Sequence, residues 1–482
     1  MQGKRSERQK ERLASTKRNK YILGMTYFYV ILFVGLITYL GYFMVYKSSD
    51  YVNSTYNKRL TKLSETITRG EILASDGSTL AKTKVNKDGT STREYPYGSM
   101  FAHSVGYSTR GENGLEAASN YYLLTSNETT WDRVKKQFTE KPVYGNTVIT
   151  TLDPKIQKIV YNAMNGYKGA CVVMEPSTGK VLAMVSKPDY DPNKINEIYD
   201  ELVSDDKNSN LVNRATQGLY SPGSTFKLVT LLEYIRENPN SYEDFSYDCD
   251  GSITHDGRTV KCIYGAHGVV DARKAIAKSC NGALIKMGLS LNLKSYRKTA
   301  EQLLFNESIS SDLKINKSRF DLTSKSSDWD VMQTAFGQGT TLITPMHNAL
   351  ILSAIANGGV LMKPYLIDSV KDAYGNEVEK NLPETYGELM TSKEADVLKD
   401  YMVSCVNEGT GKVVKSDKYQ AAAKTGSAQT NTGKQANAWF VSFAPAEDTK
   451  LVISIVLEEA GAGGENAGPI AKKVFDAILA SK

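Results

Sequence analysis

The chain has 482 residues, of which 41% are hydrophobic and 23% are charged. This composition is typical of a globular protein with a large core and excludes a wholly disordered chain. The formal net charge of +6 lies within the first twenty residues, which carry eight lysines and arginines against two glutamates. The rest of the chain is neutral, so its body is not expected to bind nucleic acid.

An apolar segment follows the basic tail. Residues 22–46 contain no charged side chain, and as a helix they would span about 37 Å, enough for a hydrocarbon core of roughly 30 Å. A cleaved signal peptide and a buried core helix are the alternatives, but the run is long and no small-residue cleavage site follows it. We expect a cytoplasmic tail at 1–20, a single-pass anchor at 21–46 and the remaining chain outside the cell membrane.

The segment from residue 50 to 146 is polar and broken, which predicts a small irregular domain. Within it, RGEILASDGSTLA (69–81) predicts two short strands around a Ser-Asp-Gly turn. From Thr147 the pattern becomes regular. TVITTLDPKIQKIVYNAM (147–164) predicts a strand and then an amphipathic helix that begins at an Asp-Pro pair.

The remaining chain predicts helices packed against an antiparallel sheet. Strands are expected in ACVVMEPSTGKVLAMVS (170–186), YLIDSVKDAYGNEVEK (365–380), AAAKTGSAQ (421–429), NAWFVSFAP (437–445) and LVISIVLEEA (451–460). Helices are expected after SPGSTFK (221–227), over 272–305, in NALILSAIANGG (348–359) and from Pro469. The sequence therefore predicts an α+β protein.

The cysteines and histidines give no clear pattern. Five cysteines are too few and too scattered for a disulfide framework; they are Cys171, Cys249, Cys262, Cys280 and Cys405. Only Cys249 and Cys262 are near neighbours, and whether they form a disulfide stays open. His267 follows Cys262 at a distance that could be mistaken for a zinc signal, but no second close pair of ligands accompanies it. We therefore expect neither a metal nor a cofactor.

The stretch SPGSTFK contains a candidate nucleophile. Pro222 and Gly223 interrupt the preceding structure, and a helix that begins near Ser224 would place Lys227 on the same face. Such a pair is a weak signal alone, because a helix cap and a solvated lysine explain most cases. The same spacing recurs at Ser177/Lys180, Ser204/Lys207, Ser295/Lys298 and Ser311/Lys314. Ser177 is the weaker candidate because it falls in a predicted hairpin turn.

Two further motifs supply what a lysine-activated serine needs, namely a proton relay, a positive anchor for an anionic substrate and donors for an oxyanion. Ser279 and Asn281 offer a hydroxyl and an amide two residues apart. Lys424, Thr425 and Gly426 lie on a predicted edge strand, where alternation would place Lys424 and Gly426 on one face. S-x-x-K, S-x-N and K-T-G with gaps of 55 and 145 residues form the signature of penicillin-binding proteins and serine β-lactamases.

The chain resembles a class B penicillin-binding protein, in particular the short penicillin-binding protein A type. Further matching stretches are RGEIL with SDG, GENGLE (111–116), TTLDPKIQ, EPSTGKVLAMVSKPDYDPN, NRATQGLYSPGSTFK, GQGTTLITPMHNA (337–349), GTGK (409–412) and AKTGSAQ with AWFVSFAP. The resemblance implies a non-catalytic pedestal, at 50–146, and a penicillin-binding, serine β-lactamase-like transpeptidase domain, at 147–482, with a five-stranded antiparallel sheet flanked by helices. We interpret GTGK and residues 337–339 as structural turns.

The resemblance also implies a reaction. Ser224 would attack the D-Ala–D-Ala amide of a peptidoglycan stem peptide and release D-Ala, and an amino group of a second stem would then take over the acyl group. Lys227 would act as the base, which requires its neutral form; lowering its pKa from about 10.4 to near 7 costs about 4–5 kcal/mol. Burial and Lys424 are the expected sources of that shift. Ser279 and Asn281 would relay the proton and hold Lys227.

Substrate binding is implied for the K-T-G strand. Lys424 and Thr425 would bind the terminal carboxylate, and Gly426 would let the substrate backbone approach closely. The backbone N–H groups of Ser224 and Ser427 would form the oxyanion hole. Two departures from the usual pattern are Ser427, where threonine is more common, and Cys280 at the centre of the S-x-N motif. β-Lactams, which mimic the acylating end, should acylate Ser224.

Two other functions are weighed against this reading. A D,D-carboxypeptidase or β-lactamase would hydrolyse the acyl-enzyme, but the nearest match to the lactamase glutamate motif, EQLLFN (301–306), has one residue too many. A β-lactam sensor would need an intracellular output domain, for which the short tail leaves no room. A scaffold that acts through the pedestal can coexist with catalysis and stays open as an alternative. The resemblance implies a SEDS-family membrane glycan polymerase as a partner. The sequence does not distinguish elongation, division and sporulation.

Overall fold

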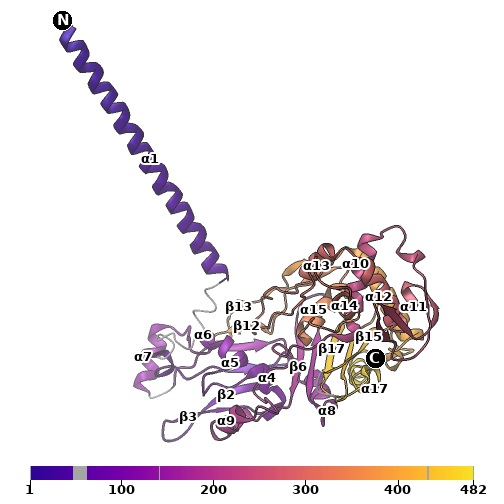
Figure 1. Cartoon of the computed structure of the whole chain (residues 1–482). Coiled ribbons are helices and arrows are strands. Elements are labelled where there is room, and N and C mark those ends of the chain that lie inside the picture. Colours follow the sequence, from indigo (N-terminus) through magenta and orange to yellow (C-terminus); the bar gives the residue numbers. More distant parts are fainter. Residues whose placement is uncertain (1, 47–61, 140–141, 431–433, 481–482) are drawn as a thin grey trace. The chain divides into compact units, whose positions relative to one another are not determined.

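The computed structural model describes residues 2–46, 62–139, 142–430 and 434–480. The chain divides into two units, residues 1–61 and 62–482. The first contains one helix, α1 (Gln2–Tyr46), drawn in indigo in Figure 1. Within α1, Asn19–Met44 is long and apolar enough to cross a membrane, which agrees with the span predicted at 21–46.

The N-terminal part of the second unit contains a six-stranded mixed sheet with the order β13-β12-β4-β1-β2-β3 (Figure 1). Its strands are β1 (Ile72–Leu73), β2 (Thr79–Val85), β3 (Ser91–Glu94), β4 (Thr147–Thr150), β12 (Ile367–Lys371) and β13 (Glu377–Lys380). β1 and β2 pair around the predicted Ser-Asp-Gly turn. The hairpin predicted at 365–380 joins this sheet through β4. The predicted start of this part at residue 50 lies outside the described residues.

Short helices connect the first strands of this sheet. They are η1 (Gly98–Phe101), α4 (Ala102–Val105), α5 (Gly114–Ala118), α6 (Asn120–Leu123) and α7 (Thr130–Phe138). Glu116 of α5 is fully buried and contacts two arginines: Arg69 Nε at 2.6 Å and Arg93 Nε at 2.7 Å. RGEIL and GENGLE therefore meet at a buried ion cluster. Burial raises the pKa of Glu116, but Arg93 and Arg69 outweigh it and hold the pKa below its usual value.

We expect Glu116→Gln to lower the free energy of unfolding by about 3–5 kcal/mol, because the buried guanidinium of Arg93 would lose the Glu116 carboxylate and that of Arg69 would keep only Glu112, at 3.4 Å. The matched control is Glu94→Gln, whose carboxylate is 36% exposed and lies 3.7 Å from Lys82; we expect it to change stability by less than about 1 kcal/mol. Because the pKa of Glu116 is lowered in the fold, its contribution is present above the unfolded pKa of about 4.3 and is lost as the pH falls further. Thermal unfolding midpoints would compare the variants, and equal midpoints would contradict the prediction.

A second sheet forms the centre of the rest of the chain. It is the predicted five-stranded antiparallel sheet, and its strands have the order β15-β16-β17-β5-β6. They are β5 (Gly169–Met174), β6 (Val181–Lys187), β15 (Ala422–Ala428), β16 (Asn437–Ala444) and β17 (Leu451–Leu457). β17 pairs with β5, so the last strands of the chain close onto the strands predicted at 170–186.

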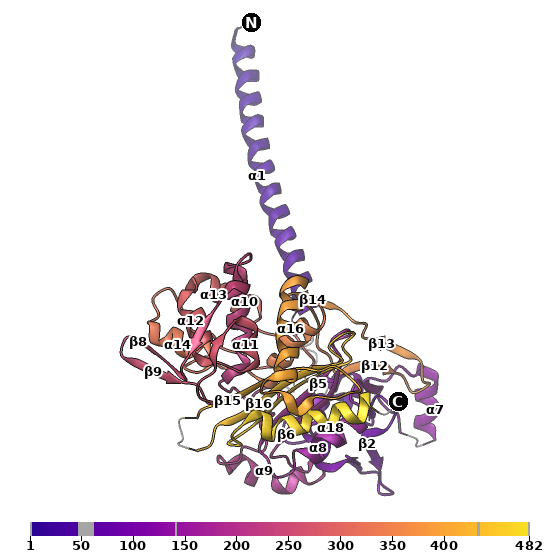
Figure 2. The same ribbon diagram turned by 90° about the vertical axis from the view of Figure 1, so that its right-hand side faces the viewer.

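Helices cover both faces of this sheet, which is why its strands read as continuous apolar runs. α8 (Pro154–Ala163) and α18 (Gly468–Leu479) pack on one face through a core that includes Phe440 of β16 (Figure 2). α15 (Pro345–Ala356) covers the other face, whose core includes the neighbouring β16 residue Val441. The Asp-Pro helix start predicted before α8 is confirmed, because the Asp153 side chain caps it.

A helical region lies beyond the α15 face. Its helices are η3 (Gly223–Thr225), α10 (Lys227–Glu237), α11 (Ala272–Ala277), α12 (Asn281–Ser290), α13 (Leu293–Gln302) and α14 (Asp328–Ala335), and α16 (Ser392–Glu408) lies against β15. Four short strands were not predicted: β7 (Tyr247–Cys249), β8 (Ser252–His255), β9 (Arg258–Lys261) and β10 (Gly268–Val270). Other elements are η2 (Pro192–Lys194), α9 (Ile195–Ser204), η4 (Tyr242–Asp244), β11 (Val360–Met362), β14 (Thr385–Glu388), η5 (Lys412–Val414) and α17 (Gly463–Asn466).

Candidate active site

The predicted nucleophile lies in a turn held by aromatic packing. Ser224 is in the 3-10 turn η3, and α10 follows from Lys227, within one turn of the predicted helix start. Phe226 anchors the turn, with ring centroids 5.6 Å from Phe305 and 5.9 Å from Phe320. The rival Ser177 lies in the turn between β5 and β6, as predicted.

Two glycines form a close backbone contact at this turn. Gly223 has φ +54° and Gly337 has φ +80°, a region that residues with a Cβ atom rarely adopt. The N–H of Gly223 donates to the carbonyl oxygen of Gly337 at 2.8 Å. A Cβ atom on Gly337 would lie 1.9 Å from the carbonyl oxygen of Gly223. The interpretation of residues 337–339 as a structural turn beside the site is therefore confirmed.

We expect Gly337→Ala to destabilise the protein by several kcal/mol, because a methyl group would displace the Gly223 backbone as well as strain its own. Gly375→Ala is the matched control. Gly375 has φ +86° but nothing within 4 Å of its Cβ position, so only a backbone strain of about 1–2 kcal/mol is expected. Thermal unfolding would separate the two variants; similar midpoints would show that the close approach to Gly223 relaxes readily.

The Lys227 side chain is fully buried and brings the first two motifs together. Its Nζ donates to Oδ1 of Asn281 at 2.7 Å and to the carbonyl oxygen of Ser279 at 2.7 Å. It also lies 3.2 Å from Oγ of Ser279. A protonated lysine has three donors and a neutral one has two, so the long Ser279 contact is the one that a neutral Lys227 could release.

Lys424 brings the third motif to the same point. Its Nζ lies 2.9 Å from Oγ of Ser279 and 3.1 Å from the carbonyl oxygen of Thr425. The Ser279 hydroxyl is therefore shared by two buried lysines. A Cβ atom on Gly426 would lie 3.3 Å from both the Pro222 carbonyl oxygen and the Thr225 side chain. This confirms that Lys424 and Gly426 share the strand face that points to the nucleophile.

The Thr425 side chain contacts a different part of the chain from Lys424. Its hydroxyl shares a hydrogen bond of 2.6 Å with the hydroxyl of Thr410. Thr410 belongs to GTGK, which follows α16 as a turn, and its N–H donates to the carbonyl oxygen of Ala277 at 3.1 Å. The interpretation of GTGK as a turn is confirmed. This turn contacts the K-T-G strand through the hydrogen bond between Thr410 and Thr425.

The electrostatics of the two lysines suit proton transfer. Burial lowers the pKa of Lys227 well below its usual value, and the positive charge of Lys424 lowers it further. Burial also lowers the pKa of Lys424, to about 8. The two expected sources of the Lys227 shift are thus present. Both effects on Lys227 act in the direction that a general base requires, toward its neutral form.

A cleft of about 760 Å³ opens in front of these groups. Ser224, Asn281 and Ser427 lie in its lining, whereas Lys227 and Lys424 are fully buried and do not line it. The aromatic side chains of Tyr220 and Trp329 form an apolar part of the cleft, whose lining is otherwise largely polar. A cleft of this size accommodates a peptide-sized ligand. All three motifs therefore converge on one accessible serine.

Residues 169–477 match the family described as "Penicillin binding protein transpeptidase domain". The match covers more than half of the chain.

The chain belongs to the penicillin-binding transpeptidases.

Residues 69–148 of this penicillin-binding protein match a second family, described as "Penicillin binding protein A dimerisation domain". The predicted resemblance to class B penicillin-binding proteins of the penicillin-binding protein A type is confirmed, as is the predicted α+β fold.

Full-length relatives extend the similarity beyond the transpeptidase domain. The chain is 32% identical over 448 residues to peptidoglycan D,D-transpeptidase PbpA of Mycolicibacterium smegmatis, covering 85% of this chain and 89% of the relative. It is 28% identical over 418 residues to stage V sporulation protein D of Bacillus subtilis, covering 81% of this chain and 63% of the relative.

Solved structures share the fold of this chain. Penicillin-binding protein A from M. tuberculosis, as a penicillin G acyl-enzyme complex, aligns with a TM-score of 0.78 and 29% identity over 86% of this chain and 100% of that one. A D,D-transpeptidase domain from Eggerthella lenta aligns with a TM-score of 0.78 and 32% identity over 86% of this chain and 98% of that one.

The structure brings together one further group that the sequence analysis did not assemble. Cys249, Cys262, His267 and Cys280 of this penicillin-binding protein lie side by side next to the S-x-N turn. The sequence analysis rejected a metal site because it found no second close pair of ligands. Cys280 brings a fourth possible ligand atom to this group. Its unusual place inside the S-x-N motif was the available signal.

Proposed function

We propose that this chain is a peptidoglycan D,D-transpeptidase that forms an acyl-enzyme on Ser224. The observation that carries the proposal is the placement of Ser279 Oγ between two buried lysines, 3.2 Å from Lys227 Nζ and 2.9 Å from Lys424 Nζ. This contact joins all three motifs in one proton-transfer network beside an accessible serine. The activity named for its PbpA relatives agrees with this chemistry.

The reaction follows from the geometry. Ser224 Oγ attacks the carbonyl carbon between the two D-alanines while neutral Lys227 accepts its proton. The C–N bond then breaks, and the proton reaches the leaving amine through the Ser279 hydroxyl, which lies within reach of both lysines. D-Ala departs and the stem remains as an ester on Ser224. An amino group of a second stem attacks the carbonyl carbon of that ester and forms the cross-link. The bond between this carbon and Ser224 Oγ then breaks, and the proton lost by the amine passes through the network to Ser224 Oγ, which restores the hydroxyl.

The cleft-facing strand supplies the substrate contacts of the proposed reaction. The positive charge of Lys424 attracts the terminal carboxylate. In the arrangement in which Thr410 donates to Thr425, the Thr425 hydroxyl keeps its own proton for that carboxylate. Gly426 presents only backbone to the substrate, because it has no side chain. The backbone N–H groups of Ser224 and Ser427, two residues that line the cleft, form the oxyanion hole.

The described lining of the cleft offers no carboxylate that could activate water, as a class A lactamase requires. Among the described residues that line the cleft there is no glutamate or aspartate. Glu301, the nearest match to the lactamase motif, pairs with Arg297 at 2.8 Å, and its side chain is 40% exposed. An acyl-enzyme without such a base is expected to persist until an amine attacks it.

The membrane context belongs to the same proposal. The basic tail at 1–20 stays in the cytoplasm, the span in α1 anchors the chain, and residues 62–482 work outside the membrane, where peptidoglycan lies. The division into a pedestal at 50–146 and a catalytic domain at 147–482 is proposed with it. A SEDS-family glycan polymerase is the proposed partner, because cross-linking requires newly made glycan strands.

The test uses the full chain in detergent with a stem pentapeptide that ends in D-Ala-D-Ala and an amino-group acceptor. Transpeptidation predicts equal amounts of free D-Ala and amide-linked product by mass spectrometry. Release of D-Ala with only the shortened peptide would identify a carboxypeptidase. A β-lactam adduct without any peptide turnover would favour the scaffold alternative.

A further inference from the structure

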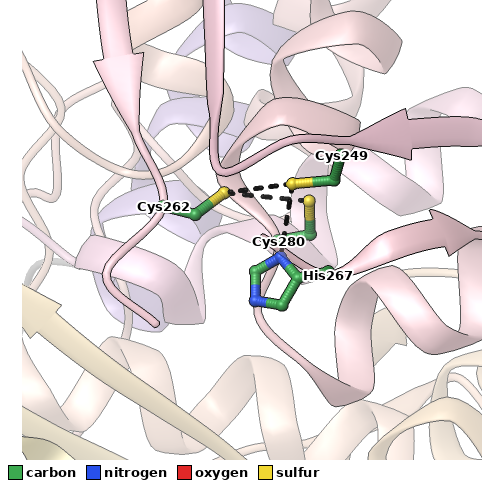
Figure 3. Close-up of side chains that lie close together, drawn as sticks. All are labelled: Cys249, Cys262, His267 and Cys280. Atoms are coloured by element: carbon green, nitrogen blue, oxygen red, sulfur yellow. Dashed lines mark hydrogen bonds between the residues drawn. The ribbon is translucent and has the colours of Figure 1, made fainter. Parts of the chain in front are cut away.

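Three cysteines and one histidine point toward one another behind the S-x-N turn (Figure 3). Cys249 ends β7, Cys262 follows β9, His267 precedes β10 and Cys280 is the N-cap residue of α12. The three cysteines are free and buried. Four separate stretches of chain therefore contribute one ligand atom each.

Three of the six distances between the possible ligand atoms match those of a tetrahedral metal site. Sγ of Cys262 lies 3.7 Å from Sγ of Cys249 and 3.9 Å from Sγ of Cys280. Nδ1 of His267 lies 3.4 Å from Sγ of Cys249, and all four atoms lie within 4.8 Å of one another. Zinc bonds of about 2.3 Å to sulfur and about 2.0–2.1 Å to nitrogen place tetrahedral sulfurs about 3.8 Å apart, and a sulfur and a nitrogen about 3.5 Å apart.

Backbone N–H groups point at two of the sulfurs. The N–H of Asn281 donates to Sγ of Cys262 at 3.3 Å, and the N–H of Ala283 donates to Sγ of Cys280 at 3.5 Å. Both donors belong to the first turn of α12, whose positive end stabilises negative charge. Nε2 of His267 has no hydrogen-bond partner among the described residues, so the ring meets the cluster through Nδ1 alone.

We propose that Cys249, Cys262, His267 and Cys280 bind one structural Zn²⁺ ion. Three thiolates and one imidazole fill the four tetrahedral positions, which leaves none for water or substrate. Binding replaces the thiol protons with the metal and involves no oxidation. It also answers the question left open by the sequence, because a disulfide between Cys249 and Cys262 would consume two of the four ligands.

The zinc ion would hold the catalytic turn, a consequence that rests on the proposed function. Cys280 stands between Ser279 and Asn281, the two residues that contact Lys227 Nζ. Nδ2 of Asn281 donates to the carbonyl oxygen of Lys261 at 2.9 Å, next to the ligand Cys262. Ser279 has φ +56°, a conformation that needs support from its surroundings. The cysteines and His267 are thus positioning residues.

Metal analysis of the full chain, purified in detergent without a metal-affinity step, tests the site. We expect roughly one zinc per chain, its loss in Cys262→Ser, and its retention in the control Cys171→Ala, which removes a buried free cysteine from β5. Thiol counting after unfolding in chelator should give five thiols, whereas a disulfide would leave three. Three thiols and no zinc would overturn the proposal.

A second measurement does not depend on how the variants fold. Co²⁺ exchanged into the unmodified chain should show thiolate-to-cobalt charge transfer and the intense visible bands of a tetrahedral ion; octahedral spectra would overturn the Cys₃His assignment. Benzylpenicillin acylation before and after chelation tests the positioning role. We expect at least a tenfold loss of rate that added Zn²⁺ restores. An unchanged rate in metal-free protein would overturn the positioning role, and no acylation in either form would instead contradict the proposed function.

Discussion

Ser224→Ala is expected to abolish covalent labelling by benzylpenicillin. The β-lactam ring opens onto a serine oxygen. Among the described residues, Ser224 is the one serine that combines a place in the cleft with a buried lysine three residues later. Removing a single hydroxyl leaves the Phe226 anchor and the Gly223–Gly337 contact in place. The fold should therefore survive while the adduct disappears.

Intact-protein mass spectrometry and a peptide map would measure this result. The unmodified chain should gain one penicilloyl group on the peptide that contains Ser224, and the adduct should persist over many minutes. Ser177→Ala is the matched control, because Ser177 has the same Ser-x-x-Lys spacing but lies in a β-turn. It should label like the unmodified chain.

Other outcomes would each change the conclusion. An adduct retained in Ser224→Ala would place the nucleophile elsewhere. Rapid loss of the adduct with release of penicilloic acid would identify a β-lactamase, despite the lack of an acidic residue among the described residues of the cleft. A chain that never labels would remove the acyl-enzyme from the proposed function.

The positions of the candidate catalytic residues in the fold follow largely from local patterns in the sequence. Strand alternation places Lys424 and Gly426 on one face, and helical periodicity places Lys227 one turn after Ser224. The three motifs identify the family, and the family implies the fold. The structure adds the distances that turn three separate motifs into one network around Ser279.

Contacts between distant segments could not be predicted in this way. The hairpin β12–β13 is recognisable as a hairpin, but nothing in its own residues shows that it pairs with β4. The same limit hid the Cys₃His cluster. Its ligands are 13, 5 and 13 residues apart in the sequence, and the short strands β7 to β10 that bring them together have too few residues for a periodic pattern.

Lys227→Met is expected to reduce the second-order rate of Ser224 acylation by about 10²- to 10⁴-fold, the usual contribution of a general base. Methionine fills a similar volume and removes the cost of burying an amine, so the variant should fold. Asn281 and Ser279 lose a donor, which adds to the kinetic loss. Lys180→Met is the control, because Lys180 belongs to the rival pair and its side chain is 34% exposed.

The pH profile distinguishes loss of a base from general damage. Lys227 must be neutral, so the rate should rise with pH through its pKa, which burial and Lys424 hold well below the usual value. Lys424 must be charged, so the rate should fall again as the pH passes its pKa of about 8. The two limbs report the coupled pair. In Lys227→Met the acid limb should vanish while the alkaline limb remains; an acid limb that persists would assign the base to another group.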